Sequence, residues 1–138
     1  MLRIAEHSDM DAMVRIRAAV KENRLISRVI GASEIIDQIE RTGRGWVYEV
    51  DGAVVGFAIG NAEAANIWAL FIDPPYAGRG IGRALHDEML AWLWSRGVET
   101  LWLTTDPGTR AERFYRQAGW RDCGIDAHGE RRFEMNRR

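Results

Sequence analysis

The sequence predicts an α/β fold: a mixed sheet with a parallel strand pair at its middle and helices on its flanks. Three observations support this. Residues 67–72 are almost all apolar, which is typical of a strand covered on both faces. An amphipathic segment follows, and Thr100 to Thr105 then has the pattern of a strand, so a right-handed crossover joins two parallel strands. Asp51-Gly52 separates two apolar runs, which indicates an antiparallel hairpin.

Each element has its own local signal. Helices are expected where apolar residues recur at helical spacing, and strands in apolar or alternating runs between turn signals. The expected helices are Ser8 to Lys21, Ser33 to Arg41, Ile81 to Ser95 and Thr109 to Ala118. The expected strands are Leu2 to Ala5, Trp46 to Val50, Val54 to Ile59, Ile67 to Ile72, Thr100 to Thr105, Trp120 to Ile125 and Arg131 to Met135. Residues 22–32 have no regular pattern, and His86 falls on the polar side of its helix, where we expect it to be solvated.

The helices differ in how their first backbone N–H groups are satisfied. The others begin at residues whose side-chain oxygens can cap a helix, namely Ser8, Ser33 and Thr109. The helix that begins near Ile81 has no such residue, because only Gly78-Arg79-Gly80 precedes it. Its first N–H groups are therefore available to an anion, which the helix dipole also favours.

A phosphate or pyrophosphate fits this glycine-rich turn, because glycine lets the backbone approach a ligand closely. A P-loop is excluded, since the turn lacks the lysine that such a loop requires. A dinucleotide-binding turn is also disfavoured, because Arg83 stands where that motif has its third glycine and the turn does not follow the first strand.

Composition limits the function classes. The 138 residues suit one domain, and 46% of them are hydrophobic, enough for a packed core. The formal net charge of −1 gives no attraction to nucleic acid or to an anionic membrane. The single cysteine, Cys123, fits a reducing cytoplasm, and we expect it to be a small buried residue rather than a nucleophile. We expect no membrane span, leader or metal site, and a homodimer stays open.

Two motifs make the chain resemble the GCN5-related N-acetyltransferase (GNAT) family. The stretch from Ile72-Asp73-Pro74-Pro75-Tyr76 through Gly78-Arg79-Gly80-Ile81-Gly82-Arg83-Ala84-Leu85 resembles that family's loop for the pyrophosphate of acetyl-CoA. The stretch Arg110-Ala111-Glu112-Arg113-Phe114-Tyr115-Arg116-Gln117-Ala118-Gly119-Trp120 resembles its late helix and the start of the next strand. The order of elements agrees over residues 1–138, which implies a single GNAT-like domain with a splayed parallel strand pair.

The resemblance implies direct transfer of an acetyl group from acetyl-CoA to a primary amine of a small molecule or peptide in a ternary complex, without a metal. Tyr115 matches the family's acid that protonates the departing thiolate, and a backbone N–H near Leu70 or Phe71 is the candidate donor to the thioester oxygen. The implied cofactor-binding residues are Leu70, Phe71, Ile72, Gly78, Arg79, Gly80, Ile81, Gly82 and Arg83. Ala77 and Gly108 depart from the family pattern and remove side-chain contacts to the cofactor, while the backbone N–H groups remain.

The general base and the substrate stay open. Glu22, Glu63, His128 and a water-mediated base are candidates for the first role. Arg24 suits a carboxylate on an amino-acid-like substrate, whereas Glu22, Asp126 and Glu130 suit a cationic amine. Two other function classes also remain: a non-catalytic acyl-CoA-binding or sensor module, and a small α/β interaction domain without a cofactor.

Overall fold

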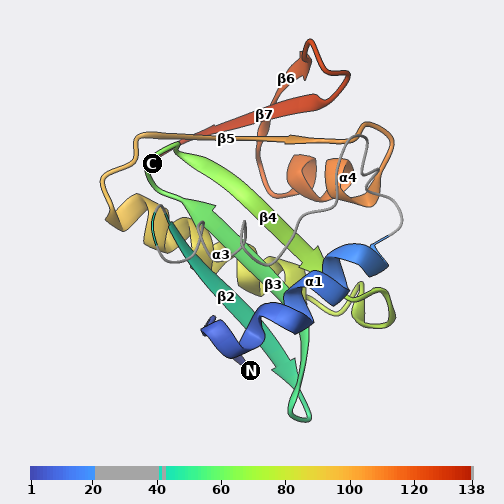
Figure 1. The fold of residues 1–138 in the computed structure, drawn as a ribbon. Helices are drawn as coiled ribbons and strands as arrows, with labels where there is room; N and C mark the ends of the chain where they lie inside the picture. Colours follow the sequence, from blue (N-terminus) through green and yellow to red (C-terminus); the bar gives the residue numbers. More distant parts are fainter. Residues whose placement is uncertain (21–40, 42, 138) are drawn as a thin grey trace.

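The computed structural model describes residues 1–20, 41 and 43–137. It contains a seven-stranded mixed sheet in the order β1-β2-β3-β4-β5-β7-β6 (Figure 1). The strands are β1 (Leu2–Ile4), β2 (Gly43–Val50), β3 (Ala53–Asn61), β4 (Asn66–Ile72), β5 (Thr100–Thr105), β6 (Arg121–Ile125) and β7 (Arg131–Asn136). The α-helices are α1 (Met10–Ala19), α3 (Ile81–Ser95) and α4 (Arg110–Gln117). The predicted mixed sheet with flanking helices is confirmed.

The pair β4 and β5 divides the sheet. Among the described strands only this pair is parallel, and its register contains the single partner pair Asn66 and Trp102. At that end the strands are pinned, because Asn66 Nδ2 donates to the Trp102 carbonyl at 3.2 Å and the Trp102 N–H donates to the Ala65 carbonyl at 3.0 Å. Toward their carboxyl ends the strands diverge, so the edge of β4 that faces β5 lacks a neighbouring strand there.

The hairpin at Asp51-Gly52 forms as predicted. Both residues have positive φ, 51° and 80°, which is the conformation of a two-residue type I′ turn. The hairpin sets β2 antiparallel to β3, and β3 in turn pairs antiparallel with β4. This half of the sheet therefore supports β4 from one side only.

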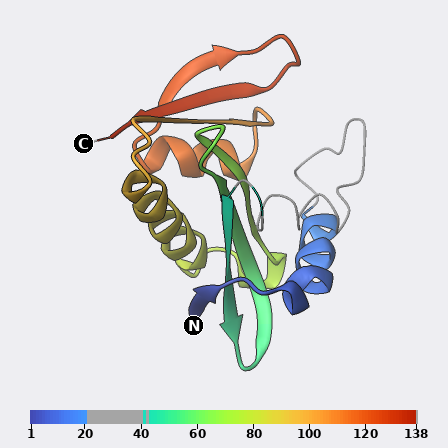
Figure 2. The ribbon, with the colours of Figure 1, turned by 60° about the vertical axis from the view of Figure 1, so that its left-hand side comes forward.

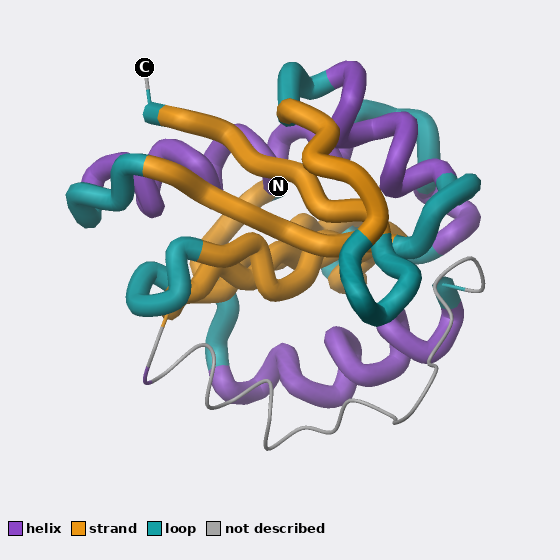
Figure 3. Tube along the Cα trace, turned by 90° about the horizontal axis from the view of Figure 1, so that it is seen from above, coloured by secondary structure: helices purple, strands orange, loops and turns teal. Residues whose placement is uncertain are grey.

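Helices cover both faces of the sheet (Figure 2). Side chains of a strand alternate between faces, so β3 supplies both cores. On one face Met13 and Ile16 of α1 pack against Phe57 and Ile59, and all four are buried. On the other face α3 contributes its apolar side, and α4 lies beside α3 under the β5–β7 half. Seen from above, α1 lies apart from the other helices, across the sheet (Figure 3). None of the helices in the described ranges is long and apolar enough to cross a membrane.

The start of α1 differs from the prediction. Ser8 is not its cap: a short 3₁₀ turn occupies His7–Asp9 and the α-helix begins at Met10. The Asp9 carboxylate accepts from the Glu6 N–H at 2.8 Å and binds the Arg3 guanidinium, so it secures the turn to β1. The predicted helix Ser33 to Arg41 and the irregular residues 22–32 lie outside the described residues, apart from residue 41.

His86 is buried, and the expectation that it is solvated is wrong. Its side chain is 2% exposed because Trp120 and the aromatic residues of α4 cover it. Nε2 accepts from the Trp120 indole N–H at 3.0 Å, so Nδ1 carries the proton and donates to Asp87 at 2.8 Å. A neutral imidazole thus joins α3 to Trp120, which lies just beyond the end of α4.

This contact predicts a pH dependence of stability. Burial lowers the pKa of His86, although the hydrogen bond and charge of Asp87 oppose the shift. The unfolded chain therefore binds the proton more readily, so the stabilisation is complete above the unfolded pKa of about 6.5 and is lost as the pH falls below it. We expect the free energy of unfolding to decrease between pH 7.5 and 5.5, by at most about 1.4 kcal/mol per pH unit for one proton.

The variant His86→Gln isolates this effect, because its amide oxygen can still accept from Trp120 and it does not titrate. Denaturant unfolding of both proteins across the pH range measures the difference. If the free energy of unfolding decreases equally in the variant and the wild type as the pH falls from 7.5 to 5.5, another group is responsible for the pH dependence.

Candidate active site

A cavity of about 800 Å³ opens between the diverged end of β4, the glycine-rich turn and α4. Its walls include the side chains of Leu70 and Ile72 from β4, and Phe114 and Tyr115 from α4. Gly78, Gly80, Gly82 and Arg83 complete the wall on the α3 side. The glycine-rich turn therefore faces an open cavity large enough for an extended ligand.

The first turn of α3 has no internal cap. Gly78 and Gly80 have φ of 78° and 82°, the left-handed region that glycine adopts readily, and no side chain accepts from the helix start. The N–H groups of Ile81, Gly82 and Arg83 thus have no partner within the helix. The start of α4 contrasts with it, because Thr109 accepts from the Glu112 N–H at 3.3 Å. The prediction of an uncapped helix start at the turn is confirmed.

Most of the predicted cofactor-binding residues lie together. Those that line the large cavity are Leu70, Phe71, Ile72, Gly78, Gly80, Gly82 and Arg83. The side chains of the other two point elsewhere: Ile81 is 5% exposed in the core, and the Arg79 guanidinium stacks on the Tyr76 ring at 5.0 Å. Of the two departures from the family pattern, Ala77 lines the cavity and Gly108 does not.

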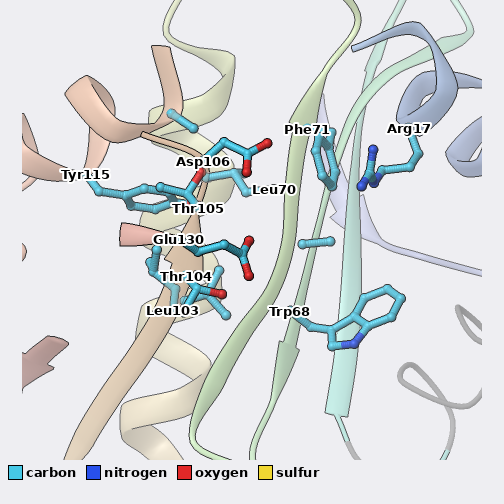
Figure 4. A pocket seen from close by; sticks show the side chains of 13 residues that line it. Arg17, Trp68, Leu70, Phe71, Leu103, Thr104, Thr105, Asp106, Tyr115 and Glu130 are labelled. Carbon is cyan, nitrogen blue, oxygen red and sulfur yellow. The ribbon is translucent and has the colours of Figure 1, made fainter. Parts of the chain in front are cut away.

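A second cavity, of about 240 Å³, lies on the other side of the gap between β4 and β5 (Figure 4). Its polar lining includes Arg17 from α1, Asp106 from the end of β5 and Glu130 before β7. Four residues line both cavities, namely Leu70, Phe71, Ala111 and Tyr115. The cavities therefore meet at the divergence of the two strands.

The backbone of β4 is asymmetric at this point. The Asp73 N–H donates to the Val55 carbonyl of β3 at 2.8 Å. Because alternate residues of a strand direct their backbone groups to opposite edges, Phe71 also faces β3, while Leu70 and Ile72 face the diverged edge. Leu70, which lines both cavities, thus directs its N–H to the junction.

Tyr115 is held at the junction by aromatic packing. It is 6% exposed, with ring centroids at 5.3 Å from Phe114, 5.7 Å from Trp120 and 6.1 Å from Phe133. Burial raises the pKa of its phenol far above the usual range. The hydroxyl is therefore protonated at neutral pH and can donate a proton.

Glu130 is positioned by a closed turn. The Asp126 carboxylate accepts from the Glu130 N–H at 3.0 Å, and the Asp126 N–H donates to the Glu130 carbonyl at 2.7 Å. The carboxyl group is half-buried beside Thr104, with which it shares a hydrogen bond (Figure 4). Burial raises the pKa of Glu130, and the charges of Asp126 and Asp106 raise it further.

The other polar candidates have different placements. Glu63 and His128 are exposed and line neither cavity, and Glu22 and Arg24 lie outside the described residues. Cys123 is exposed on β6, so the expectation of a buried cysteine is wrong: β6 is the edge strand of the sheet. No group of three or more metal-ligating side chains occurs in the part of the chain that the structure describes.

Sequence reasoning missed Arg17 and Asp106. Asp106 had one usable signal, because it follows the carboxyl end of a parallel strand, where ligands gather in α/β sheets. Arg17 adjoins the apolar positions of α1, and no sequence pattern indicates that it lines a cavity. Its proximity to the cavity depends on how the helix crosses the sheet.

The sequence comparisons give one family. Residues 13–120 match the acetyltransferase (GNAT) family. An uncharacterised N-acetyltransferase of Methanocaldococcus jannaschii is 33% identical over 88 residues, which cover 56% of this chain and 38% of that protein. The ribosomal protein bS18-alanine N-acetyltransferase of Escherichia coli is 32% identical over 78 residues, which cover 54% of this chain and 53% of that protein. The chain thus matches about half of these relatives' length or less.

Solved structures show the same fold at low identity. The PaiA N-acetyltransferase of Thermoplasma acidophilum, in complex with coenzyme A, superposes with a TM-score of 0.83 at 15% identity, covering 99% of this chain and 98% of that one. A putative acetyltransferase of Salmonella typhimurium with acetyl-CoA superposes with a TM-score of 0.81 at 16% identity, covering 99% and 92%.

Proposed function

The chain belongs to the acetyltransferase (GNAT) family, and from this membership we propose that it transfers the acetyl group of acetyl-CoA to a primary amine of a small molecule or peptide. The amine attacks directly in a ternary complex. One observation carries the proposal: two cavities meet at the divergence of β4 and β5 and share Leu70 and Tyr115. Such a junction lets two substrates enter from opposite sides and react at one point.

Release of CoA thiol from acetyl-CoA, measured with a panel of amines, tests this function. A protein that binds CoA but releases no thiol above the uncatalysed rate with any amine would be an acyl-CoA-binding module instead.

The large cavity suits the CoA moiety. Its pyrophosphate accepts hydrogen bonds from the free N–H groups of Ile81, Gly82 and Arg83, and the helix dipole adds to the attraction. The Arg83 side chain, which lines the cavity and also pairs with Asp87 at 3.1 Å, contributes positive charge. Ile81 acts through its backbone alone, because its side chain belongs to the core.

The reaction requires a donor to the thioester oxygen and two proton transfers. The Leu70 N–H, which faces the diverged edge of β4, donates to that oxygen as it gains charge. As the neutral amine forms the C–N bond its nitrogen becomes acidic, and Glu130 accepts the proton. When the C–S bond breaks, Tyr115 donates its proton to the departing sulfur. The products are an amide and the free thiol, and solvent restores both side chains.

The first prediction concerns the glycine-rich turn. At Gly82 a Cβ atom meets Ile72 at 3.6 Å and Phe114 at 3.9 Å, ordinary contact distances, whereas a longer side chain extends into the large cavity. We expect Gly82→Leu to reduce CoA affinity more than tenfold, about 1.4 kcal/mol, by calorimetry. Ala91→Leu, which adds the side chain on the exposed side of α3, is the control. Unchanged affinity in a folded Gly82→Leu protein would refute the pyrophosphate site.

The second prediction concerns Tyr115. The variant Tyr115→Phe removes one oxygen and keeps the ring, so the contacts with Phe114 and Trp120 should survive. If the hydroxyl acts only on the leaving thiolate, kcat and kcat/KM fall together by roughly 10²–10⁴-fold, while CoA affinity is unchanged. A thiolate can also leave unprotonated, so we expect the lower end of this range. Steady-state kinetics with wild-type rates would remove Tyr115 from the mechanism.

The third prediction concerns Glu130. The variant Glu130→Gln keeps the shape of the side chain but cannot accept a proton, so kcat/KM should fall by roughly 10²–10⁴-fold. In the wild type, kcat/KM should also fall as the pH drops through the raised pKa of this carboxyl group, because only the ionised form accepts a proton. The pH–rate profile of the variant should lack this fall. Glu88→Gln, on the exposed side of α3, is the matched control.

A further inference from the structure

We propose that the amine acceptor carries a carboxylate close to its amine, as a free amino acid does, and that Arg17 binds this carboxylate in the small cavity. The inference rests on the proposed acetyl transfer and names the substrate class for the same site. It depends on the state of one arginine, on the size of the cavity and on the charges of the opposite wall.

The guanidinium of Arg17 is partly buried, and two of its nitrogen atoms have no hydrogen-bond partner among the residues that the structure describes. Its Nε and Nη1 atoms are inaccessible to solvent, and no residue that the structure describes accepts a hydrogen bond from either. The guanidinium stacks on the Phe71 ring at 4.6 Å, which fixes its plane but satisfies none of its N–H groups. Arg3 differs from it, because its guanidinium binds both Asp9 and Glu49. Buried N–H groups without an acceptor are costly, so a bound anion that accepts hydrogen bonds from them would stabilise this arrangement.

The opposite wall of the cavity is acidic. Asp106 and Glu130 direct their carboxylates toward β4 from the β5 side, whereas Arg17 directs its guanidinium toward Phe71 from the α1 side (Figure 4). The acidic wall suits the amine, which must lie near Glu130 and the junction at Tyr115. The arginine, on the far wall, suits a planar anion that accepts two parallel hydrogen bonds, and a carboxylate has this geometry.

The size and charges of the cavity favour an amino acid over the other common amines. A volume of about 240 Å³ lies below the usual range for ligand pockets and suits a molecule of amino-acid size. A polyamine would place a second ammonium against Arg17. A monoamine without an acidic group would leave Nε and Nη1 of Arg17 without an acceptor, and a peptide replaces the carboxylate next to its amine with a neutral amide.

The test compares each of the twenty standard L-amino acids with its own carboxamide, at saturating acetyl-CoA, by release of CoA thiol. The two members of a pair share the amine and the side chain. The carboxamide is intrinsically the better nucleophile at neutral pH, because its amine is less basic and more of it is unprotonated. A preference for the acid therefore reports recognition of the carboxylate. We expect kcat/KM for the preferred amino acid to exceed that of its carboxamide at least tenfold.

Variants assign the preference to Arg17. In Arg17→Gln the ratio of acid to carboxamide should fall to one or below, mainly through a higher KM for the acid. Arg15→Gln on the same helix should retain the wild-type ratio, because Arg15 is exposed and lies outside both cavities. If Arg17→Gln does not fold, product inhibition of the wild type replaces the variant experiment. It compares N-acetyl amino acids with the carboxamides of the same compounds, and we expect the acid to bind at least tenfold more tightly.

The outcomes separate this inference from the proposed function. If the enzyme acetylates carboxamides, or short peptides with a free N-terminus, as well as or better than the free acids, the carboxylate site is overturned. Acetyl transfer itself then remains intact. An unchanged ratio in folded Arg17→Gln would overturn the role of Arg17. If none of these amines is acetylated but another amine of the panel is, the inference fails and the proposed function stands. If CoA binds and no amine at all is acetylated, both fail.

Discussion

The divergence of β4 from β5 is the constraint on which the rest of the structure depends. Parallel strands normally exchange hydrogen bonds along their length, but here the register reduces to Asn66 and Trp102. Beyond that point the edge of β4 has lost a partner strand, and the two halves of the sheet separate. Both cavities, and the position of the Leu70 N–H at the gap, are consequences of this one interruption in the backbone ladder.

A divergence of this kind needs support from both sides. On the β3 side the hairpin and the cores under α1 and α3 hold β4 in place. On the β5 side His86 and Trp120 join α3 to the end of α4. Glu112 of α4 receives hydrogen bonds from the Arg116 and Arg131 guanidinium groups at 3.3 and 3.0 Å, which ties the β6–β7 hairpin to the helix that carries Tyr115. Tyr115 and Glu130 therefore reach the small cavity from elements that are linked to each other.

The polar groups at the junction divide according to their environment. Aromatic packing and burial keep Tyr115 protonated, while burial and the neighbouring carboxylates raise the pKa of Glu130. The small cavity is thus bordered by a phenol that can donate a proton and by a carboxyl group that is a stronger base than usual. Arg17, across the cavity, offsets the negative charge of that wall.

The sequence by itself determined the parts of this protein that depend on neighbours in the chain. The type I′ turn at Asp51-Gly52, the uncapped start of α3 and the crossover from β4 to β5 all follow from local chemistry, since positive φ, missing capping oxygens and apolar periodicity are encoded within a few residues. The start of α1 was predicted less well, because Asp9 binds the Glu6 N–H and the Arg3 guanidinium and a 3₁₀ turn over His7–Asp9 precedes the helix. Only the tertiary structure decided that His86 is buried under Trp120, that Leu70 faces the gap, and that Arg17, Asp106 and Glu130 surround one cavity. These residues come from α1, the end of β5 and the last hairpin, and their proximity depends on the crossing of α1 and on the angle at which the two strands separate, neither of which a local pattern specifies.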